Sequence, residues 1–146
     1  HLDAAEGIVA WARENASLSG LQAAPIRWVV EDVAKFLNRE VRRGHTYDAL
    51  VLDPPSFGRG SKGEVWKLER DLPALLDLCR QVLSREPLFV LLSAHTPGVT
   101  PQGLANLLLD MLGPERGHIT SMEMTLPQQH GARLLPSGAL ARWSQD

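Results

Sequence analysis

The sequence contains one cysteine, little net charge and no long apolar run, and each absence narrows the class of protein. Cys79 has no partner for an intramolecular disulfide, which fits a reducing compartment. The formal net charge of -2 creates no overall field toward nucleic acid or membrane, so any such attraction has to come from a local patch. No run reaches the roughly 18 apolar residues of a membrane span, and the first residues show no apolar signal region. We therefore expect a cytoplasmic protein that does not cross a membrane.

The length and the composition indicate one globular domain. A chain of 146 residues, 44% of them hydrophobic and 22% charged, is long enough for a real core and too short for two ordinary domains. We therefore expect a single domain over residues 1–146. The chain begins with His1, and Leu2-Asp3 resembles the end of a strand already under way. We expect an N-terminally incomplete piece of a longer protein.

The most informative stretch is an apolar run that ends in Asp-Pro-Pro. Leu50–Leu52 is typical of a strand buried on both faces, as in parallel sheets covered by helices. Pro54 and Pro55 supply no N–H and hold the preceding residue extended, so strand pairing stops at Asp53. The Asp53 carboxylate and nearby carbonyls then lie at the carboxyl end of the strand, where open α/β sheets bind ligands. Such acceptors suit a ligand that is cationic or carries N–H groups; the alternative is a turn that Asp53 merely caps.

Strands and helices alternate along most of the chain, and this order predicts a parallel, doubly wound sheet. The fold class we expect is a Rossmann-like α/β fold with a C-terminal antiparallel hairpin. The first helix places Ile8, Trp11 and Ala12 on one apolar face, so we expect Trp11 in the core. The predicted helices are residues 4–16, 33–43, 68–84 and 101–112, and the predicted strands are 2–3, 26–30, 50–52, 87–93, 119–126 and 134–143, with a glycine-rich loop over 57–66.

Three acidic residues each stand where a predicted strand gives way to a helix or loop. Asp3, Asp32 and Asp53 would then lie along one edge of a parallel sheet. An acid after the second strand of a Rossmann-type unit commonly binds the hydroxyl pair of a ribose, and the acid after the next strand is placed to meet an adenine. Taken singly, Asp3 and Asp32 are better explained as helix caps. Together with Asp-Pro-Pro, they favour a site that binds a nucleoside.

These motifs resemble those of class I S-adenosylmethionine (SAM)-dependent methyltransferases that carry Asp-Pro-Pro-x-Phe after the fourth strand. That subgroup includes bacterial ribosomal-RNA large-subunit methyltransferases. The resemblance covers nearly the whole chain and rests on Leu2-Asp3-Ala4, Glu31-Asp32-Val33, Asp53-Pro54-Pro55-Ser56-Phe57-Gly58, Lys62-Gly63 and Trp66-Lys67-Leu68.

The resemblance implies a cofactor and a set of site residues. One part of the family pattern is missing from this chain. Asp3 would bind the ribose of SAM, Asp32 the adenine, and Phe57 would stack on the target base. The family's first strand and glycine-rich turn are missing between the strands that end at Asp3 and Asp53, so we expect an N-terminal segment or a second copy in a homo-oligomer to complete the sheet. The implied cofactor-binding residues are Asp3, Ala4, Asp32, Val33 and Asp53, and the implied catalytic residues are Asp53, Pro54, Pro55 and Phe57.

A basic cluster follows the Asp-Pro-Pro stretch and indicates the substrate. Basic side chains that meet phosphates, beside an aromatic ring for stacking, are how single-stranded or flipped RNA bases are bound. A solvated loop is an equally good explanation of the cluster taken alone. The predicted substrate-binding residues are Arg59, Lys62, Trp66 and Lys67, with Arg70 beside them.

Three further expectations limit the mechanism and leave alternatives open. Cys79 lies in a predicted helix, far in sequence from Asp-Pro-Pro, so this chain offers no thiol for methylation of a pyrimidine ring carbon. The histidines lack metal-ligand spacing, so we assign no metal. A methyltransferase acting on a base of ribosomal RNA is the leading hypothesis; the alternatives are a nicotinamide-dependent dehydrogenase fragment and a non-catalytic Rossmann-like interaction domain.

Overall fold

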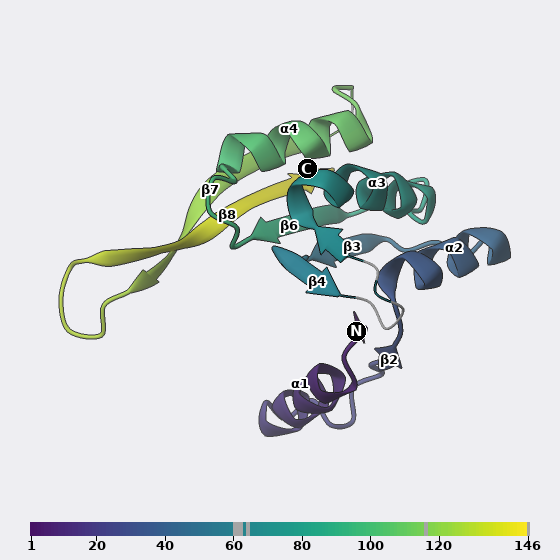
Figure 1. Cartoon of the computed structure of the whole chain (residues 1–146), viewed down its shortest axis with the longest axis horizontal. Coiled ribbons are helices and arrows are strands. Elements are labelled where there is room, and N and C mark those ends of the chain that lie inside the picture. Colours follow the sequence, from purple (N-terminus) through teal and green to yellow (C-terminus); the bar gives the residue numbers. More distant parts are fainter. Residues whose placement is uncertain (60–62, 64, 116, 146) are drawn as a thin grey trace.

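The computed structural model describes residues 1–146 except 60–62, 64, 116 and 146. It has the mixed α/β fold that the sequence predicted, with its helices and strands arranged as in Figure 1. No helix within these described ranges has the length and apolar character of a membrane span. The strands are β1 (Leu2–Asp3), β2 (Val29–Val30), β3 (Ala49–Leu52), β4 (Phe57–Arg59), β5 (Val65–Lys67), β6 (Phe89–Ala94), β7 (His118–Pro127) and β8 (Leu134–Ser144). The helices are α1 (Glu6–Leu18), α2 (Val33–Arg43), α3 (Leu68–Gln81) and α4 (Pro101–Leu112).

The larger sheet has the strand order β3-β6-β8-β7. β3 and β6 pair in parallel, while β8 runs antiparallel to both β6 and β7. The predicted C-terminal hairpin is therefore confirmed, and Figure 1 shows it reaching well beyond the rest of the sheet. α4 packs against β7 and β8, and α3 packs between α4 and α2.

A second, two-stranded sheet contains β1 and β2, which are parallel with Asp3 opposite Val30. Within the described part of the chain, no ladder of backbone hydrogen bonds joins this sheet to β3. Leu2 and Val29 pack instead against the same apolar core as the larger sheet. The separation falls between the strands that end at Asp3 and Asp53, where the sequence predicted an unfilled position.

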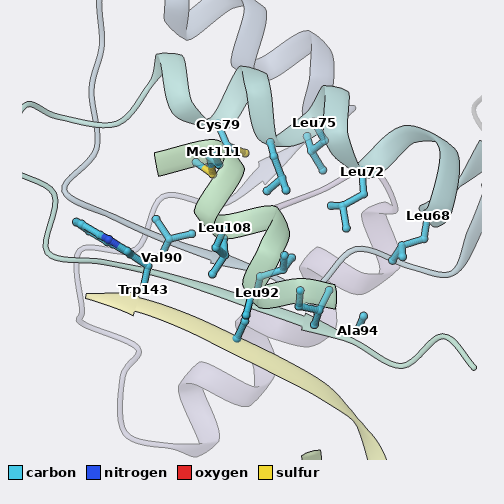
Figure 2. Close-up of a cluster of buried hydrophobic side chains, with 14 of the residues drawn as sticks. Leu68, Leu72, Leu75, Cys79, Val90, Leu92, Ala94, Leu108, Met111 and Trp143 are labelled. Atoms are coloured by element: carbon cyan, nitrogen blue, oxygen red, sulfur yellow. The ribbon is translucent and has the colours of Figure 1, made fainter. Parts of the chain in front are cut away.

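The core lies between the larger sheet and the helices α3 and α4 (Figure 2). In β6 the buried side chains alternate with half-buried ones, which is the period of a strand with one face on the core. Trp143 of β8 is 1% exposed, so the expectation that this tryptophan is a core residue is confirmed. The core side chains labelled in Figure 2 are Leu68, Leu72, Leu75 and Cys79 of α3, Val90, Leu92 and Ala94 of β6, Leu108 and Met111 of α4, and Trp143.

The structure corrects the prediction of a loop over residues 57–66. β4 and β5 form an antiparallel pair in which Phe57 faces Lys67 and Gly58 faces Trp66. The sequence gives little sign of this pairing because each strand has only three residues. Pro73 also lies in the second turn of α3 rather than in its first, where it lacks the N–H that would reach the Glu69 carbonyl.

The predicted apolar face of the first helix is the other correction. Trp11 is 61% exposed and Ile8 is 44% exposed, so neither lies in the core. The main contacts of α1 are with the short strands β1 and β2, and Val9 is its one buried residue within the described ranges. The periodicity located the helix correctly, but this chain offers too little surface to cover that face.

Candidate active site

Asp53 follows β3 directly and lies beside the end of β6. Because Leu52 pairs with Leu92, the next residues of the two strands, Asp53 and Ser93, are neighbours. The Ser93 hydroxyl donates to Asp53 Oδ1 at 2.8 Å. The Asp53 side chain remains 60% exposed. The carboxylate is thus held in place while still open to a ligand.

The Pro54-Pro55-Ser56 segment is fixed from two sides. The Trp66 indole N–H donates to the Pro55 carbonyl at 2.7 Å. On the other side, the Thr96 hydroxyl donates to Ser56 Oγ at 2.7 Å, and Thr96 is itself buried. The segment after β3 is therefore tied both to the β4–β5 hairpin and to the segment after β6.

His95 is a residue that the sequence prediction missed, since histidines were considered only as metal ligands. Its Nδ1 lies 2.5 Å from the carbonyl oxygen of Ser137 in β8, and its Nε2 lies 3.7 Å from Asp53 Oδ1. The signal in the sequence was its place, immediately after the apolar strand β6 and thus at the same edge as Asp53. Among the described residues, no cluster of three or more His, Cys, Asp or Glu side chains suits a metal ion.

The β4–β5 hairpin divides the predicted substrate residues between its two faces. Phe57, Arg59 and Lys67 share one face, because directly opposed and alternate residues of paired strands project the same way. Phe57 is 52% exposed, and the Arg59 guanidinium lies 5.9 Å from the centre of its ring. Trp66 lies on the other face, against Pro55. Lys62 lies outside the described residues.

Arg70 is committed to structural contacts. Its guanidinium forms hydrogen bonds with the Asp71 carboxylate and with the Val65 carbonyl. Asp71 also accepts a hydrogen bond from the Lys67 backbone N–H at 2.8 Å, and Arg70 holds the pKa of the Asp71 carboxyl below its usual value. These contacts connect the end of the hairpin to the start of α3.

Asp3 ends β1 and Asp32 follows β2, and each carboxylate accepts a hydrogen bond from a nearby backbone N–H. Asp3 Oδ1 accepts a hydrogen bond from the Ala5 N–H at 2.7 Å, and Asp32 Oδ1 caps α2 by accepting one from the Lys35 N–H at 2.9 Å. The capping explanation is therefore correct for Asp32, whereas Asp3 accepts from Ala5, the residue before α1, and does not cap that helix. Both contacts use the Oδ1 oxygen, and for the described residues no hydrogen bond or ion pair is recorded to either Oδ2. The backbone contact and a ligand contact are thus compatible at both carboxylates.

An ion pair fixes the turn that carries Asp32. The Arg39 guanidinium meets both carboxylate oxygens of Glu31 at 2.6 Å, a bidentate geometry. The hydrogen bonds from Arg39 hold the pKa of Glu31 below its usual value. Ala4 and Val33, the other predicted cofactor residues, directly follow Asp3 and Asp32, with Ala4 exposed and Val33 half-buried.

The structure brings Asp53, Ser93 and His95 together at the ends of β3 and β6. Asp3 and Asp32 stand at the ends of β1 and β2, which form the other sheet. Within the described ranges, no hydrogen bond or ion pair joins Asp53 to either of the other two acids. An apolar hollow of about 210 Å³ lies between α3 and α4, and neither Asp53 nor His95 lines it. The candidate site is therefore defined by its polar groups at the strand ends and not by this hollow.

Comparison with known proteins relates the chain to methyltransferases. No protein-family model matches it. It is 33% identical over 104 residues to ribosomal RNA large subunit methyltransferase I of Aeromonas hydrophila, a match that covers 71% of this chain and 25% of that protein. A SAM-dependent methyltransferase structure from Agrobacterium tumefaciens matches 100% of this chain and 48% of its own, with 39% identity and a TM-score of 0.89. The structure of the methyltransferase SMU.776, complexed with SAH, shares the fold at a TM-score of 0.72 and 22% identity.

The chain spans about a quarter of the curated relative and about half of the similar solved structure. Over that part, the Rossmann-like architecture and the antiparallel C-terminal hairpin agree with the resemblance drawn from the Asp-Pro-Pro motif. By sequence and by fold, the chain is similar to a part of the SAM-dependent methyltransferases.

Proposed function

We propose that this chain is part of a cytoplasmic enzyme that transfers a methyl group from SAM to a base of ribosomal RNA. The observation that carries the proposal is Asp53. It follows the parallel strand β3 at Pro-Pro, it is held by Ser93, and its carboxylate stays open to a ligand. In this chain β3 is half-buried and Val51 is exposed, so the prediction that the strand is buried on both faces is wrong. The relative from Aeromonas hydrophila, a ribosomal RNA large subunit methyltransferase, supports an RNA substrate and a role in processing that RNA.

The residues present fit the adenosine half of SAM. Asp3 and Asp32 follow adjacent parallel strands, and each uses its Oδ1 atom for a backbone N–H, so its Oδ2 is available for ribose hydroxyls or the adenine amine. Carboxylate oxygens are acceptors, which is the chemistry that a hydroxyl pair and an amine require. When bound, SAM supplies a methyl group on a positively charged sulfur. The residues that would hold it are Asp3, Ala4, Asp32 and Val33, with Asp53 toward the methyl group.

The groups after β3 and on the hairpin suit a nucleobase and its phosphates. Asp53 and the Pro54 carbonyl offer acceptors to base N–H groups, and the exposed ring of Phe57 offers a stacking surface. Arg59 and Lys67 share the face of Phe57 and supply positive charge for the RNA backbone. In methyl transfer the protein mainly positions the reactants and supplies electrostatics.

A further strand would complete the sheet in the whole protein. The edge of β3 that faces away from β6 is unpaired within the described part of the chain, and Val51 on this strand is 68% exposed. Unpaired ladder groups at such an edge favour the addition of a strand. We propose that an additional segment of the full-length protein fills this position, with a second copy of the chain as the alternative source.

The test is isothermal titration calorimetry of the full-length protein with SAM and, separately, with NAD. We expect SAM to bind and NAD not to bind. Asp3→Asn and Asp32→Asn retain the oxygen that accepts the backbone N–H but lose the carboxylate charge, so each should weaken SAM binding by about tenfold or more. Asp110→Asn on the exposed side of α4 is the control. Tight NAD binding would support the dehydrogenase instead, and the binding of neither ligand would support a non-catalytic domain.

A further inference from the structure

The contact between His95 and Ser137 fixes which ring nitrogen carries the proton. A backbone carbonyl oxygen only accepts hydrogen bonds, so the Nδ1 atom at 2.5 Å from the Ser137 oxygen has to be the donor. In the neutral imidazole, the other nitrogen then has a free lone pair. Nε2 of His95 is therefore a proton acceptor, and its direction is set by β8.

The lone pair of Nε2 lies beside the one carboxylate at the centre of the candidate site. Nε2 is 3.7 Å from Asp53 Oδ1, the same oxygen that accepts the Ser93 hydroxyl hydrogen. Two acceptors side by side repel each other until a proton arrives, and an imidazolium beside a carboxylate is a favourable ion pair. Among the residues that the structure describes, Asp53 provides the carboxylate that lies within ion-pair distance of His95. The pair thus places a proton acceptor and a carboxylate side by side at the ends of β6 and β3.

A glycine in β8 permits this placement of the ring. Gly138 has φ of 144°, and a Cβ added there would lie 2.6 Å from the Ala94 carbonyl oxygen and 3.1 Å from His95 Nδ1. A side chain at this position would displace the segment after β6 or the imidazole. The β7–β8 hairpin therefore packs closely against the His95 ring at Gly138, on the side of the ring away from Asp53.

We propose that His95 Nε2 is the base that accepts the proton lost from the methylated nitrogen of the target nucleobase. This inference rests on the proposed function and names the class of its target atom. The nitrogen forms a new C–N bond with its lone pair, while the electron pair of the broken C–S bond stays on the sulfur of the methyl donor. The N–H bond then breaks, its electrons remain on nitrogen, and the proton forms an N–H bond at Nε2. Asp53 stabilises the imidazolium that results.

The burial of Cys79 means that this cysteine does not serve a pyrimidine ring carbon as target. Methylation at such a carbon generally requires a thiolate that adds to the ring. Cys79 is the only cysteine of this chain. It is 1% exposed on α3, in the core, and burial raises the pKa of its thiol to about 12. The chemistry that this chain does place beside Asp53 is a proton acceptor, which an N–H target requires.

The test compares full-length wild type with His95→Gln, His95→Ala and the control His130→Gln, whose histidine lies in the exposed turn between β7 and β8. Methyl transfer to RNA is measured over a range of pH. General-base catalysis contributes about 10²- to 10⁴-fold, so kcat should fall by about 100-fold or more in both His95 variants, with KM nearly unchanged. The rise of the wild-type rate with pH should disappear in His95→Gln. Free imidazole should restore part of the rate to His95→Ala, which a purely structural role does not predict.

A second measurement does not depend on activity. Long-range ¹H–¹⁵N NMR spectra of the histidine rings, assigned with His95→Gln, should show the neutral His95 ring protonated on Nδ1. A proton on Nε2 in the neutral ring would overturn the proposal. So would a His95→Gln variant with wild-type kcat and pH profile, which leaves the proposed function standing. A wild-type protein that neither binds SAM nor methylates RNA would overturn the proposed function, and this proposal with it.

Discussion

Asp53→Asn should separate the chemical role of Asp53 from any structural one. The asparagine retains an oxygen that accepts from Ser93, and the side chain is 60% exposed, so the free energy of unfolding should change by less than about 1 kcal/mol. The lost charge has a larger effect on the reaction. A unit positive charge on His95 Nε2 at 3.7 Å gains about 1 kcal/mol from the carboxylate at the dielectric constant of water and about 4 kcal/mol at a value of 20. The rate of transfer should therefore fall by about fivefold to a thousandfold.

Two measurements on the same preparations test this reasoning. Urea unfolding followed by circular dichroism gives the free energy of unfolding, and transfer of a labelled methyl group to RNA gives the rate. Asp53→Ala, which removes both carboxylate oxygens, should abolish transfer while unfolding stays cooperative. Asp77→Asn on the exposed side of α3 serves as the control. If Asp53→Asn lost cooperative unfolding, or kept the wild-type rate, the role assigned to this carboxylate would be wrong.

Two further variants and one labelling experiment test separate parts of the structure. Tyr47→Phe removes the 2.6 Å hydrogen bond to the buried Glu40 carboxylate and should lower the free energy of unfolding by about 1–3 kcal/mol at pH 7. That bond holds the pKa of Glu40 below its ordinary 4.5. The stability that it contributes is therefore present above pH 4.5 and is lost as the pH falls through the lower pKa of the folded state. Urea titrations should show a smaller difference in the free energy of unfolding between wild type and Tyr47→Phe at about pH 3 than at about pH 7. Cys79 should react with a maleimide at pH 8 only when the protein unfolds, and rapid labelling of the native protein would contradict its burial. Trp66→Phe removes the N–H that meets the Pro55 carbonyl, and kcat should fall severalfold while the free energy of unfolding changes by less than about 1 kcal/mol, because water replaces the donor.

The sequence was sufficient for elements whose signals are local. Pro54 and Pro55 end β3 because neither supplies an N–H, and the structure stops the strand at Leu52. The last helix begins at Pro101 after the Thr100 cap and ends before Gly113, within the bounds predicted from these residues. The apolar strands and the terminal hairpin followed from periodicity in the same way.

Features that depend on contacts between distant segments were not predictable from one sequence. The β4–β5 pair depends on the Trp66 indole reaching the Pro55 carbonyl, 11 residues away. His95 gained its significance from Ser137, 42 residues further along the chain. The exposure of Trp11 depends on which surface is available to cover α1, and periodicity carries no information on that.

The absence of a hydrogen-bonded ladder between β1 and β3 has a consequence for how this protein responds to ligands. The carboxylates that we propose for the adenosine lie at the ends of one sheet and the groups that we propose for the methyl donor at the ends of the other, and among the described residues no backbone ladder joins the two sheets. A small molecule that contacts both sheets would therefore stabilise their association. Binding would raise the free energy of unfolding by roughly 2.7 kcal/mol when the ligand is present at about a hundred times its Kd, and a thermal melting experiment would detect this as a higher melting temperature.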